Sequence, residues 1–292
     1  MQLEGLLVPT ITPLDQNDRL YEQALEQHLE HLIASGVAGV IFCGTTGEYY
    51  ALDDREREHL LKCGRDIIGE RVLRIAGINA LSTRGCIQRA RHAESLGYDA
   101  LMMAPPAYSL PRQHEIAAHC RAVAGATSLD LMLYNFPQRT GVGMAPETVA
   151  ELAAIDNIVG IKESGGEFGR IPELLALEND RFRLICGTDD QAADYLFWGV
   201  RSWISGSGNV FPAEQAGMIH AASAGDWDRV RELMQGMLPA IASMEASDYN
   251  QKAKLGCRRH GVDAGPVRAP LLSLPGDEQQ AFLDLLEADT AI

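Results

Sequence analysis

The hydrophobic residues of this chain fall into eight short runs, separated by longer stretches in which apolar and polar positions alternate. Apolar runs of this length, bounded by glycine and polar residues, are typical of strands that are buried on both faces of a parallel sheet. The predicted strands are residues 6–11, 37–43, 72–77, 99–104, 129–134, 157–162, 182–187 and 202–206.

The stretches between these runs carry apolar residues at the three- and four-residue spacing of an amphipathic helix. Gly36, Gly69 and Gly97 stand just before the next apolar run, where a helix commonly ends in a left-handed residue. The predicted helices are residues 21–35, 53–68, 83–96, 112–125, 146–154, 170–178 and 190–199.

Eight strands that alternate with helices predict an α/β protein with a parallel sheet, and eight is the number that closes a (β/α)8 TIM barrel. An open, doubly wound sheet is the alternative, but no Gly-x-Gly-x-x-Gly follows the first strand to favour it. We therefore expect a barrel over residues 1–210 and a C-terminal helical extension over residues 211–292, packed on the barrel as one structural unit. The helices predicted in this extension are residues 212–224, 226–245, 248–260 and 276–288.

Composition and charge narrow the classes of function. The net charge of −15 argues against a nucleic-acid partner. The chain has no apolar segment of about 18 residues and no signal-peptide pattern, so no membrane association is expected. The six cysteines are scattered, without a Cys-x-x-Cys pair or a cysteine–histidine cluster at metal spacing, which favours free thiols, a cytoplasmic location and no metal. His28 and His31 have mainly polar neighbours and are interpreted as solvated surface residues.

Lysine is scarce in this chain, with four residues against 21 arginines. Lys62, Lys252 and Lys254 lie in polar stretches, where the ammonium group is expected to stay in water. Lys162 instead ends an apolar run and is expected at the C-terminal edge of a buried strand. Burial disfavours an ammonium group unless it is paired or loses its proton. A neutral amine there is a nucleophile that forms Schiff bases with carbonyls, whereas an ion pair with Glu163 is the structural alternative.

Seven of the eight predicted strands end in polar or glycine-rich residues, at the edge where TIM barrels carry their active sites. Gly44-Thr45-Thr46-Gly47 offers backbone N–H groups and two hydroxyls that suit a carboxylate, although the same residues also suit a tight turn. Tyr134 is either a functional residue at this edge of the barrel or an aromatic residue of the core. Arg139 is either a ligand-binding residue or a surface charge.

Three motifs at these strand ends resemble the dihydrodipicolinate synthase/N-acetylneuraminate lyase family. They are Gly44-Thr45-Thr46-Gly47-Glu48, Tyr134-Asn135-x-Pro137 and Gly160-Ile161-Lys162-Glu163, in this order and at this spacing. The resemblance extends from about Gly5 into the C-terminal helices. It implies a class I aldolase barrel that acts on pyruvate or another 2-keto acid without metal or organic cofactor. It also implies a homotetramer assembled from tight dimers.

The resemblance further implies a role for each catalytic residue. Lys162 forms the Schiff base, and Tyr134 acts as the acid and base that moves protons to and from the substrate. Thr45 and Thr46 hold the carboxylate of the keto acid and help to relay protons. Tyr108 completes that relay from the neighbouring subunit across the tight dimer.

Three more residues match substrate-binding positions of the family. Arg139 corresponds to the arginine with which synthases bind the carboxylate of a second substrate, a task that suits a bidentate guanidinium. Gly187 and Ile204 correspond to positions that line the pyruvate pocket.

A Schiff base on Lys162 becomes an iminium, which stabilises carbanion character at C3 of the keto acid. That carbanion attacks an aldehyde, is released by C–C cleavage, or expels a C4 hydroxyl.

Several positions depart from lysine-biosynthetic synthases. Tyr49 and Tyr50 follow the threonine motif where small residues are usual, and Leu81 and Gly85 replace the asparagine and glutamate that hold an inhibitory lysine. We therefore expect no feedback inhibition by lysine.

Aldol condensation or cleavage of a 2-keto acid is the primary expectation for the reaction. A dehydratase of 2-keto-3-deoxy sugar acids or a deaminase of 4-hydroxy-pyrroline-2-carboxylate would use the same Schiff base, and a non-catalytic barrel that binds a small acid is a further alternative.

Overall fold

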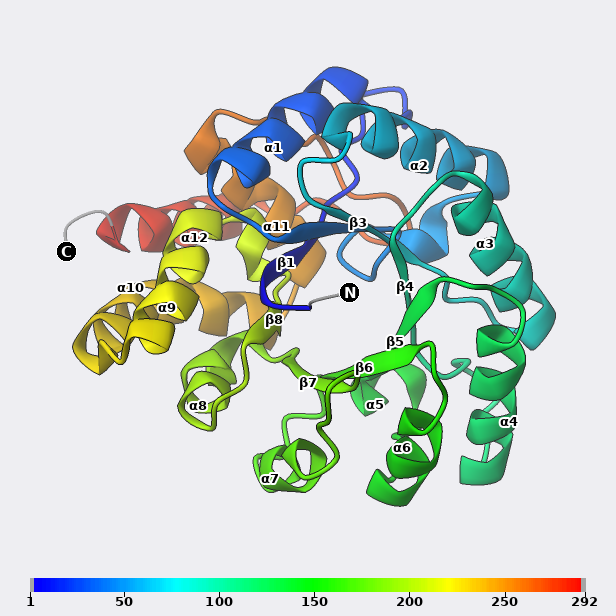
Figure 1. Ribbon diagram of the computed structural model, residues 1–292. Coiled ribbons are helices and arrows are strands. Elements are labelled where there is room, and N and C mark those ends of the chain that lie inside the picture. Colours follow the sequence, from blue (N-terminus) through cyan, green and yellow to red (C-terminus); the bar gives the residue numbers. More distant parts are fainter. Residues whose placement is uncertain (1–2, 290–292) are drawn as a thin grey trace. The chain divides into compact units, whose positions relative to one another are not determined.

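The structure is a computed structural model that describes residues 3–289, and within this range eight parallel strands form a closed barrel (Figure 1). The strands follow one another around the barrel in the order of the sequence. Every predicted strand is present, which confirms the (β/α)8 TIM barrel. The strands are β1 (Gly5–Pro9), β2 (Gly39–Phe42), β3 (Leu73–Gly77), β4 (Ala100–Met103), β5 (Asp130–Asn135), β6 (Ile158–Glu163), β7 (Arg183–Cys186) and β8 (Ser202–Ile204).

The predicted helices between the strands are also present. Gly36, Gly69 and Gly97 all have positive φ, of 85°, 60° and 77°, as expected for residues that end a helix. These helices are α1 (Glu22–Ala34), α2 (Asp54–Ile68), α3 (Thr83–Ser95), α4 (Gln113–Ala124), α6 (Pro146–Ala153), α7 (Arg170–Leu175) and α8 (Ala192–Phe197).

The chain forms two compact units within the described residues. One consists of Leu73–Ile204 with the short segment Leu3–Glu4, and contains β3 to β8 with the helices between them. The other consists of Gly5–Val72 and the chain from Ser205 onward, and contains β1, β2, α1, α2 and the C-terminal helices. The expected division into a barrel over residues 1–210 and an extension over residues 211–292, packed on it as one structural unit, stays a prediction.

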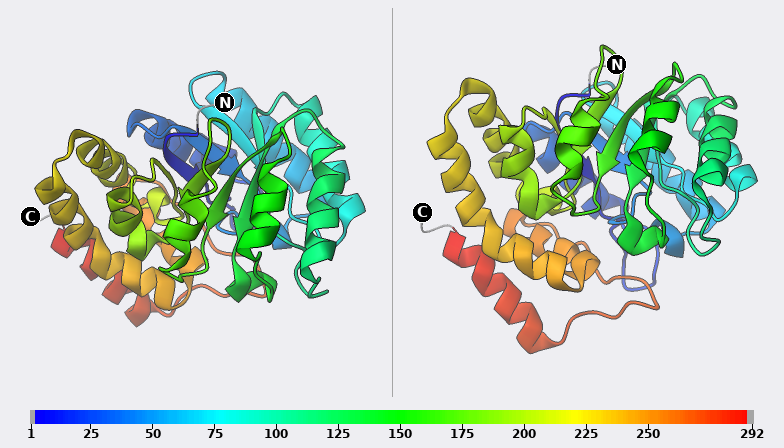
Figure 2. Two further views of the ribbon diagram at one scale, coloured as in Figure 1. Left: turned by 60° about the horizontal axis from the view of Figure 1, so that its bottom comes forward. Right: turned by 90° about the horizontal axis from the view of Figure 1, so that it is seen from below.

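Four longer helices follow β8, at the positions expected from the sequence. Figure 2 shows α12 lying along α10 at the C-terminal end of the chain. No helix within residues 3–289 is both long and apolar enough to cross a membrane. The four helices are α9 (Pro212–Ala224), α10 (Trp227–Ala246), α11 (Tyr249–Gly256) and α12 (Gly276–Asp289).

Helix α2 illustrates how local sequence determines an element of this fold. The Asp53 carboxylate accepts hydrogen bonds from the backbone N–H groups of Arg55 and Glu56, both at 2.8 Å. The Glu56 carboxylate in turn accepts one from the Asp53 N–H at 2.9 Å, which completes a capping box.

Further along α2, a Cβ at Gly64 would lie only 2.3 Å from the ring of Phe42 on β2. A glycine is therefore required for α2 to approach β2 this closely.

The interpretation of His28 and His31 as surface residues is wrong. His28 is fully buried, and its Nε2 donates to Oδ1 of Asn209 at 2.8 Å. His31 is partly buried and stacks on the ring of His260, with ring centroids 3.9 Å apart. Asn209 also bonds the backbone at Pro9 and Ile11, at the end of β1. The polar neighbours of these histidines along the helix concealed partners that lie some two hundred residues away in the sequence.

The expectation that Lys252 and Lys254 are solvated is also wrong. Their exposed fractions are only 8% and 3%, because α11 is almost entirely buried. The ammonium group of Lys252 donates to the backbone oxygens of Ser243 and Ser247, at 2.6 and 3.0 Å. Backbone oxygens can satisfy a buried ammonium group, and no residue pattern in the sequence reveals them.

Some short elements were not predicted. Helix α5 (Pro137–Thr140) directly follows β5, and three 3-10 turns lie at Tyr49–Ala51, Asp189–Gln191 and Ser207–Asn209. Each is shorter than the window in which helical periodicity can be recognised. All four follow the C-terminal ends of strands, so they shape the loops that carry the candidate site.

Candidate active site

Lys162 lies at the C-terminal end of β6, as the sequence predicted. All six residues of β6 are buried, and Lys162 itself has an exposed fraction of 6%. In the register of the sheet, Lys162 is paired with Tyr134 of β5 on one side and with Ile185 of β7 on the other. At Gly160, a Cβ would lie 2.7 Å from the backbone oxygen of Arg183, so a side chain there would push β6 away from β7. Close strand packing thus fixes the position of Lys162.

The ammonium nitrogen of Lys162 has no counter-ion within the described residues. Its nearest recorded contact is the ring of Tyr134, whose centroid lies 4.4 Å from Nζ. The ring face favours a cation but cannot replace a carboxylate as a partner. A buried amine without a carboxylate is the environment expected of a lysine that reacts as a nucleophile.

The alternative ion pair between Lys162 and Glu163 is not formed. Glu163 is fully buried, and its carboxylate accepts hydrogen bonds from Asn135 at 2.8 and 2.9 Å and from Arg170 at 3.0 Å. Successive residues of a strand point to opposite faces, which separates the two side chains. Arg170 comes from α7 and also donates to the backbone oxygen of Met144 at 2.9 Å. The sequence did not indicate this network, although it braces the strand end that carries Lys162.

Tyr134 is buried, with an exposed fraction of 4%, and stacks on Phe136 at a centroid distance of 5.7 Å. Its hydroxyl has no hydrogen-bond partner within residues 3–289, which leaves the group available to a ligand. The guanidinium of Arg139, on the short helix α5, lies 5.8 Å from the Phe136 ring centroid. Arg139 is exposed and has no ion pair among the described residues. The structure therefore brings Lys162, Tyr134 and Arg139 into one chain of contacts through Phe136.

Gly187, which follows β7, packs directly on the stem of Lys162. A Cβ at this position would lie 2.7 Å from Cγ of Lys162 and 2.2 Å from Oγ of Ser164. The hydroxyl of Ser164 donates to the Gly187 backbone oxygen at 2.7 Å. Ile204, the last residue of β8, is fully buried. Gly187 thus belongs to the surroundings of Lys162, while the lining role of Ile204 stays a prediction.

Tyr108 has a different environment from the other candidate residues of its unit. Its side chain has an exposed fraction of 93%, and its hydroxyl has no partner within the described residues. The backbone at Tyr108 is left-handed, with φ of 71°, an uncommon conformation for a bulky residue. Within one chain, the structure does not bring Tyr108 to Tyr134 or Lys162.

Thr45 and Thr46 lie in the other unit, in a tight turn after β2. The turn has left-handed residues at both ends, Cys43 with φ of 57° and Glu48 with φ of 53°. Its backbone is held from outside, because Asn250 donates to the Thr45 backbone oxygen at 3.2 Å. A Cβ at Gly206 would lie 2.9 Å from Oγ1 of Thr46, so the loop after β8 also approaches this turn closely.

A buried ion-pair network anchors the end of the threonine turn. The Glu48 carboxylate lies 2.6 Å from the ammonium nitrogen of Lys254 and accepts a hydrogen bond from the Arg268 backbone N–H at 2.8 Å. The Lys254 ammonium group also donates to the Pro266 backbone oxygen at 2.7 Å. Burial lowers the pKa of Lys254, and the Glu48 charge opposes that shift. The Arg268 side chain extends the network to Asp18 and Glu56, both at 2.8 Å.

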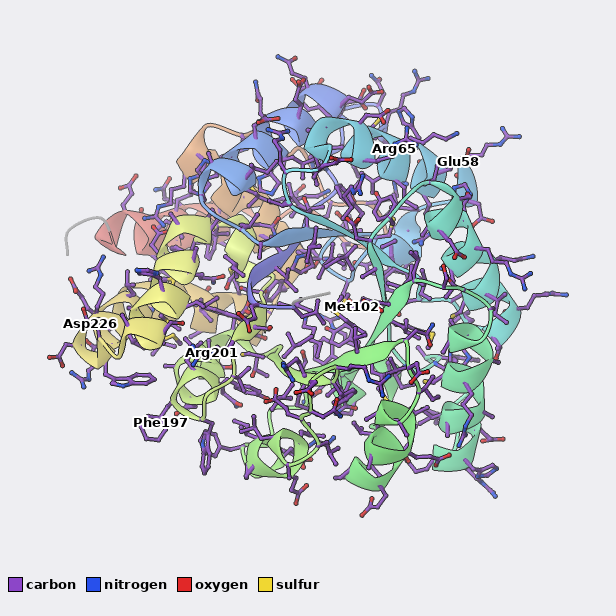
Figure 3. All side chains as sticks on the ribbon, viewed as in Figure 1. Glu58, Arg65, Met102, Phe197, Arg201 and Asp226 are labelled. Atoms are coloured by element: carbon purple, nitrogen blue, oxygen red, sulfur yellow. The ribbon has the colours of Figure 1, made fainter. Side chains whose placement is uncertain are left out.

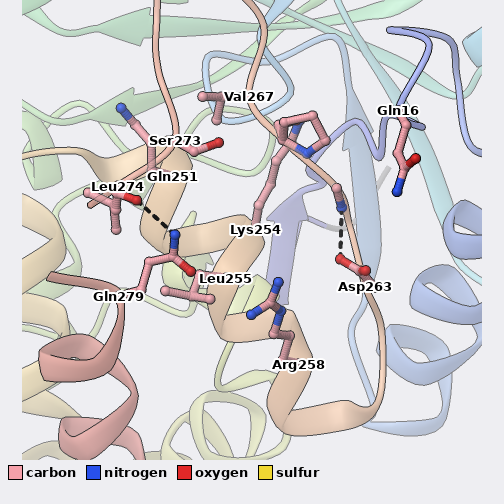
Figure 4. Close-up of a pocket in the computed structure, with 12 residues that line it drawn as sticks. Gln16, Gln251, Lys254, Leu255, Arg258, Asp263, Val267, Ser273, Leu274 and Gln279 are labelled. Atoms are coloured by element: carbon pink, nitrogen blue, oxygen red, sulfur yellow. Dashed lines mark hydrogen bonds between the residues drawn. The ribbon is translucent and has the colours of Figure 1, made fainter. Parts of the chain in front are cut away.

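A cavity of about 250 Å³ lies beside Lys254 (Figure 4). Lys254 is one wall of this cavity, but its ammonium group is committed to Glu48 and Pro266. The cavity therefore offers no reactive amine. Its polar lining comes from Gln16, Gln251, Arg258, Asp263, Ser273 and Gln279.

A closed (β/α)8 barrel that buries an unpaired lysine against a tyrosine at the end of its sixth strand has the features of a class I aldolase-type lyase. Comparison with known proteins agrees with this class. The model of the dihydrodipicolinate synthetase family matches residues 2–289. The chain therefore belongs to the dihydrodipicolinate synthetase family and is an aldolase-type lyase.

Individual relatives cover nearly the whole chain. The 4-hydroxy-tetrahydrodipicolinate synthase of Desulforudis audaxviator is 34% identical, and that of an Exiguobacterium species is 32% identical, with at least 96% of each chain covered. Among solved structures, dihydrodipicolinate synthase from Bacillus anthracis superimposes with a TM-score of 0.95 at 28% identity, over 98% of both chains. The chloride-inhibited dihydrodipicolinate synthase from Acinetobacter baumannii, solved in complex with pyruvate, has a TM-score of 0.94 at 29% identity over the full length of both chains.

Proposed function

We propose that Lys162 forms a Schiff base with pyruvate or a closely related 2-keto acid, and that the chain condenses the resulting enamine with an aldehyde. The observation that carries this proposal is the buried amine of Lys162, which lies 4.4 Å from the Tyr134 ring without a carboxylate partner. The complex of the Acinetobacter baumannii relative with pyruvate supports the choice of keto acid.

The proposed reaction begins when Nζ of Lys162, as the neutral amine, attacks the C2 carbonyl carbon of pyruvate. Proton transfer to the carbinolamine oxygen allows water to leave, and an iminium remains. Loss of a C3 proton then gives an enamine, whose C3 attacks the aldehyde carbon and forms the new C–C bond. Hydrolysis of the product iminium consumes one water and restores Lys162. The unpartnered hydroxyl of Tyr134 is the group that we assign to these proton transfers.

We assign the carboxylate of the keto acid to Thr45 and Thr46. Their turn supplies hydroxyl and N–H donors, and Asn250 and the buried Glu48 hold its backbone in place. A turn that is fixed before binding loses little freedom when the carboxylate enters, and so favours affinity.

We assign the second substrate to Arg139. The relatives are named for a product that is a cyclic dicarboxylate containing nitrogen, so the aldehyde must contribute a carboxylate and the ring nitrogen. An amino-acid semialdehyde meets this requirement. The Arg139 side chain is exposed and its guanidinium has no ion pair within residues 3–289, so a bidentate contact with that carboxylate is open to it. Nothing in the structure or among these relatives favours the dehydratase or deaminase over the synthase.

We further propose that the chain works as a homotetramer in which Tyr108 serves the site of a neighbouring subunit. The side chain of Tyr108 is 93% exposed and has no partner within residues 3–289, which suits a contact between chains. Leu110, close by in the same loop, is also exposed, and its backbone is also left-handed.

Because all six cysteines are free, we also retain the proposal of a reducing, cytoplasmic location.

Proton exchange at C3 of pyruvate tests the proposal without the second substrate. Formation of the enamine in D2O replaces the methyl protons of pyruvate with deuterium, and NMR follows the loss of the methyl signal. We expect rapid exchange with the wild-type protein and none above background with Lys162→Met. Absence of exchange with the folded wild-type protein would overturn the Schiff-base proposal. Turnover of a 2-keto-3-deoxy sugar acid without any aldehyde would favour the dehydratase instead.

A further inference from the structure

Three side chains with metal-binding donor atoms meet on the outer surface of α1 and α2. Glu22 lies in the first turn of α1, while His59 and Cys63 lie one turn apart on α2. Nε2 of His59 is 2.8 Å from Oε1 of Glu22, and Sγ of Cys63 is 3.8 Å from the same nitrogen. The donor atoms of all three side chains lie within 4.8 Å of one another. The sequence did not reveal this cluster, because Glu22 comes from a different helix.

The distances are close to those around a tetrahedral zinc ion. Bond lengths of about 2.0–2.1 Å to nitrogen, 2.3 Å to sulfur and 2.0–2.2 Å to oxygen would place nitrogen and sulfur about 3.6 Å apart, and nitrogen and oxygen about 3.3 Å apart. The nitrogen–sulfur and nitrogen–oxygen distances of 3.8 and 2.8 Å each differ from these values by about 0.5 Å or less, and the oxygen–sulfur distance is within 4.8 Å. Glu22 and His59 can make shifts of this size, because their side chains are 61% and 51% exposed.

The charge around Cys63 also favours a cation. The carboxylate oxygen of Glu22 lies within 4.8 Å of the Cys63 sulfur, and its negative charge attracts a cation. Lys62 is paired with Glu58 at 2.5 Å, and Arg65 with Asp66 at 2.6 Å. Figure 3 shows Glu58 and Arg65 pointing outward from α2. Lys62 and Arg65 are thus occupied by other carboxylates, and the partner that the structure gives Glu22 is His59.

Cys63 differs from the other cysteines of the chain in its access to solvent. The remaining five are buried, whereas Cys63 is partly exposed. An accessible thiol beside an imidazole and a carboxylate forms a mixed sulfur, nitrogen and oxygen donor set that suits Zn²⁺ better than the hard cations Mg²⁺ or Ca²⁺.

We propose that Glu22, His59 and Cys63 form a binding site for one thiophilic divalent cation, with Zn²⁺ as the best-fitting ion and water in the fourth position. Binding exchanges the S–H bond of Cys63 for an S–metal bond, and the displaced proton goes to solvent. The bound ion links α1 to α2 and stabilises the folded chain, because the unfolded chain cannot hold the three donors together. The site is independent of the Schiff-base chemistry.

Titration of the metal-free, full-length protein with Co²⁺ tests this site. We expect one Co²⁺ per chain, a thiolate-to-cobalt charge-transfer band in the near ultraviolet, and loss of the band when Zn²⁺ displaces the cobalt. Zn²⁺ should also slow alkylation of Cys63 by a maleimide and raise the melting temperature. Absence of the charge-transfer band in the wild-type protein, or binding of Co²⁺ without it, would overturn the proposal.

Variants locate the site and separate it from weak surface binding. Cys63→Ser should abolish the charge-transfer band, and His59→Gln and Glu22→Gln should each weaken Zn²⁺ binding by about tenfold or more. His114→Gln is the matched control, because His114 is an exposed histidine on another helix and should leave the affinity unchanged. Circular dichroism verifies that every variant is folded. Equal Zn²⁺ affinity of wild type and His59→Gln would contradict the site.

Discussion

Two lysines of this chain are buried to nearly the same extent, with exposed fractions of 6% for Lys162 and 3% for Lys254, yet their surroundings differ. Lys254 lies 2.6 Å from the carboxylate of Glu48 and also donates to a backbone oxygen. The Lys162 ammonium group, by contrast, has the face of the Tyr134 ring as its one recorded partner among the described residues. Burial alone therefore does not identify a reactive lysine. Lys252, which is also buried, donates to two backbone oxygens, so what distinguishes Lys162 among the described residues is that its ammonium group has neither a carboxylate nor a backbone-oxygen partner.

The two acidic residues beside these lysines support the same distinction. Glu48 faces its lysine, whereas Glu163 is turned away from the neighbouring Lys162 and bonds to Asn135 and Arg170. Each buried carboxylate thus has a basic or amide partner, which a buried charge requires. Within residues 3–289, the ammonium group of Lys162 has no carboxylate partner, as our proposal of a nucleophile requires.

The largest expected effect is on catalysis, in the variant Lys162→Ala. Removal of the amine leaves no route to the covalent intermediate, so kcat should fall by at least about 10⁴-fold. The melting temperature should stay the same or rise, because a buried and unpaired amine is removed. Steady-state kinetics and thermal unfolding measure the two effects. Activity within tenfold of wild type would contradict the role of Lys162.

The reverse pattern is expected for Lys254→Met. This change leaves the Glu48 carboxylate buried without its partner and should destabilise the fold by about 3–5 kcal/mol. Urea unfolding measures the loss, with Lys162→Met as the matched control that should unfold close to wild type. The double variant with Glu48→Gln should recover part of the stability. Equal unfolding midpoints for the two methionine variants would contradict the claim that Lys254, unlike Lys162, stabilises the fold through its carboxylate partner.

Acid should destabilise the unit that contains Lys254, through its buried histidines. Burial lowers the pKa of His28 from 6.5 to about 4, so the folded chain keeps this ring neutral while the unfolded chain protonates it. Stability should therefore be unaffected above pH 6.5 and fall as the pH drops from 6.5 toward 4, by up to about 3 kcal/mol for a shift of this size. His260 is shifted in the same direction, to about 4.

Urea unfolding at a series of pH values measures this dependence. His28→Gln should make the curve less steep between pH 6.5 and 4, because glutamine cannot gain a proton and can still donate to Asn209, while the contribution of His260 remains. His114→Gln, which changes an exposed histidine, should leave the curve unchanged. A wild-type protein as stable at pH 4.5 as at pH 7 would contradict the buried, neutral state of His28.

A smaller effect is expected for Tyr134→Phe, which keeps the ring stacked on Phe136 but removes the hydroxyl. Loss of a positioned acid and base typically costs about 10²-fold in rate or more. Schiff-base formation should become slower but still occur on Lys162. Stopped-flow measurement of that step separates it from C–C bond formation. An unchanged kcat would assign the proton transfers to another group.

The sequence predicted the barrel and much of the site because both depend on local patterns. The apolar run before Lys162 and the turn residues around Thr45 can be recognised without knowledge of distant contacts. The partners could not be predicted in this way. Glu48 and Lys254 are far apart in the sequence, and so are His28 and Asn209, so their pairing depends on tertiary structure.

Glu163 shows the same limit at close range. An ion pair between neighbouring residues is a natural reading of Lys162-Glu163, but a strand places the two side chains on opposite faces. The actual partner of Glu163, Arg170, lies on α7 beyond a glycine-rich loop. Sequence therefore pointed to Lys162, and structure was needed to show that it has no counter-ion among residues 3–289.

Reductive trapping tests the central claim most directly. The protein is incubated with pyruvate and borohydride, digested, and mapped by mass spectrometry for the lysine that carries the reduced adduct. The account predicts a single adduct on the peptide that contains Lys162, dependent on pyruvate, with none on the peptides that contain Lys62, Lys252 or Lys254. No adduct, or an adduct on Lys254 instead, would contradict the assignment of Lys162 as the nucleophile.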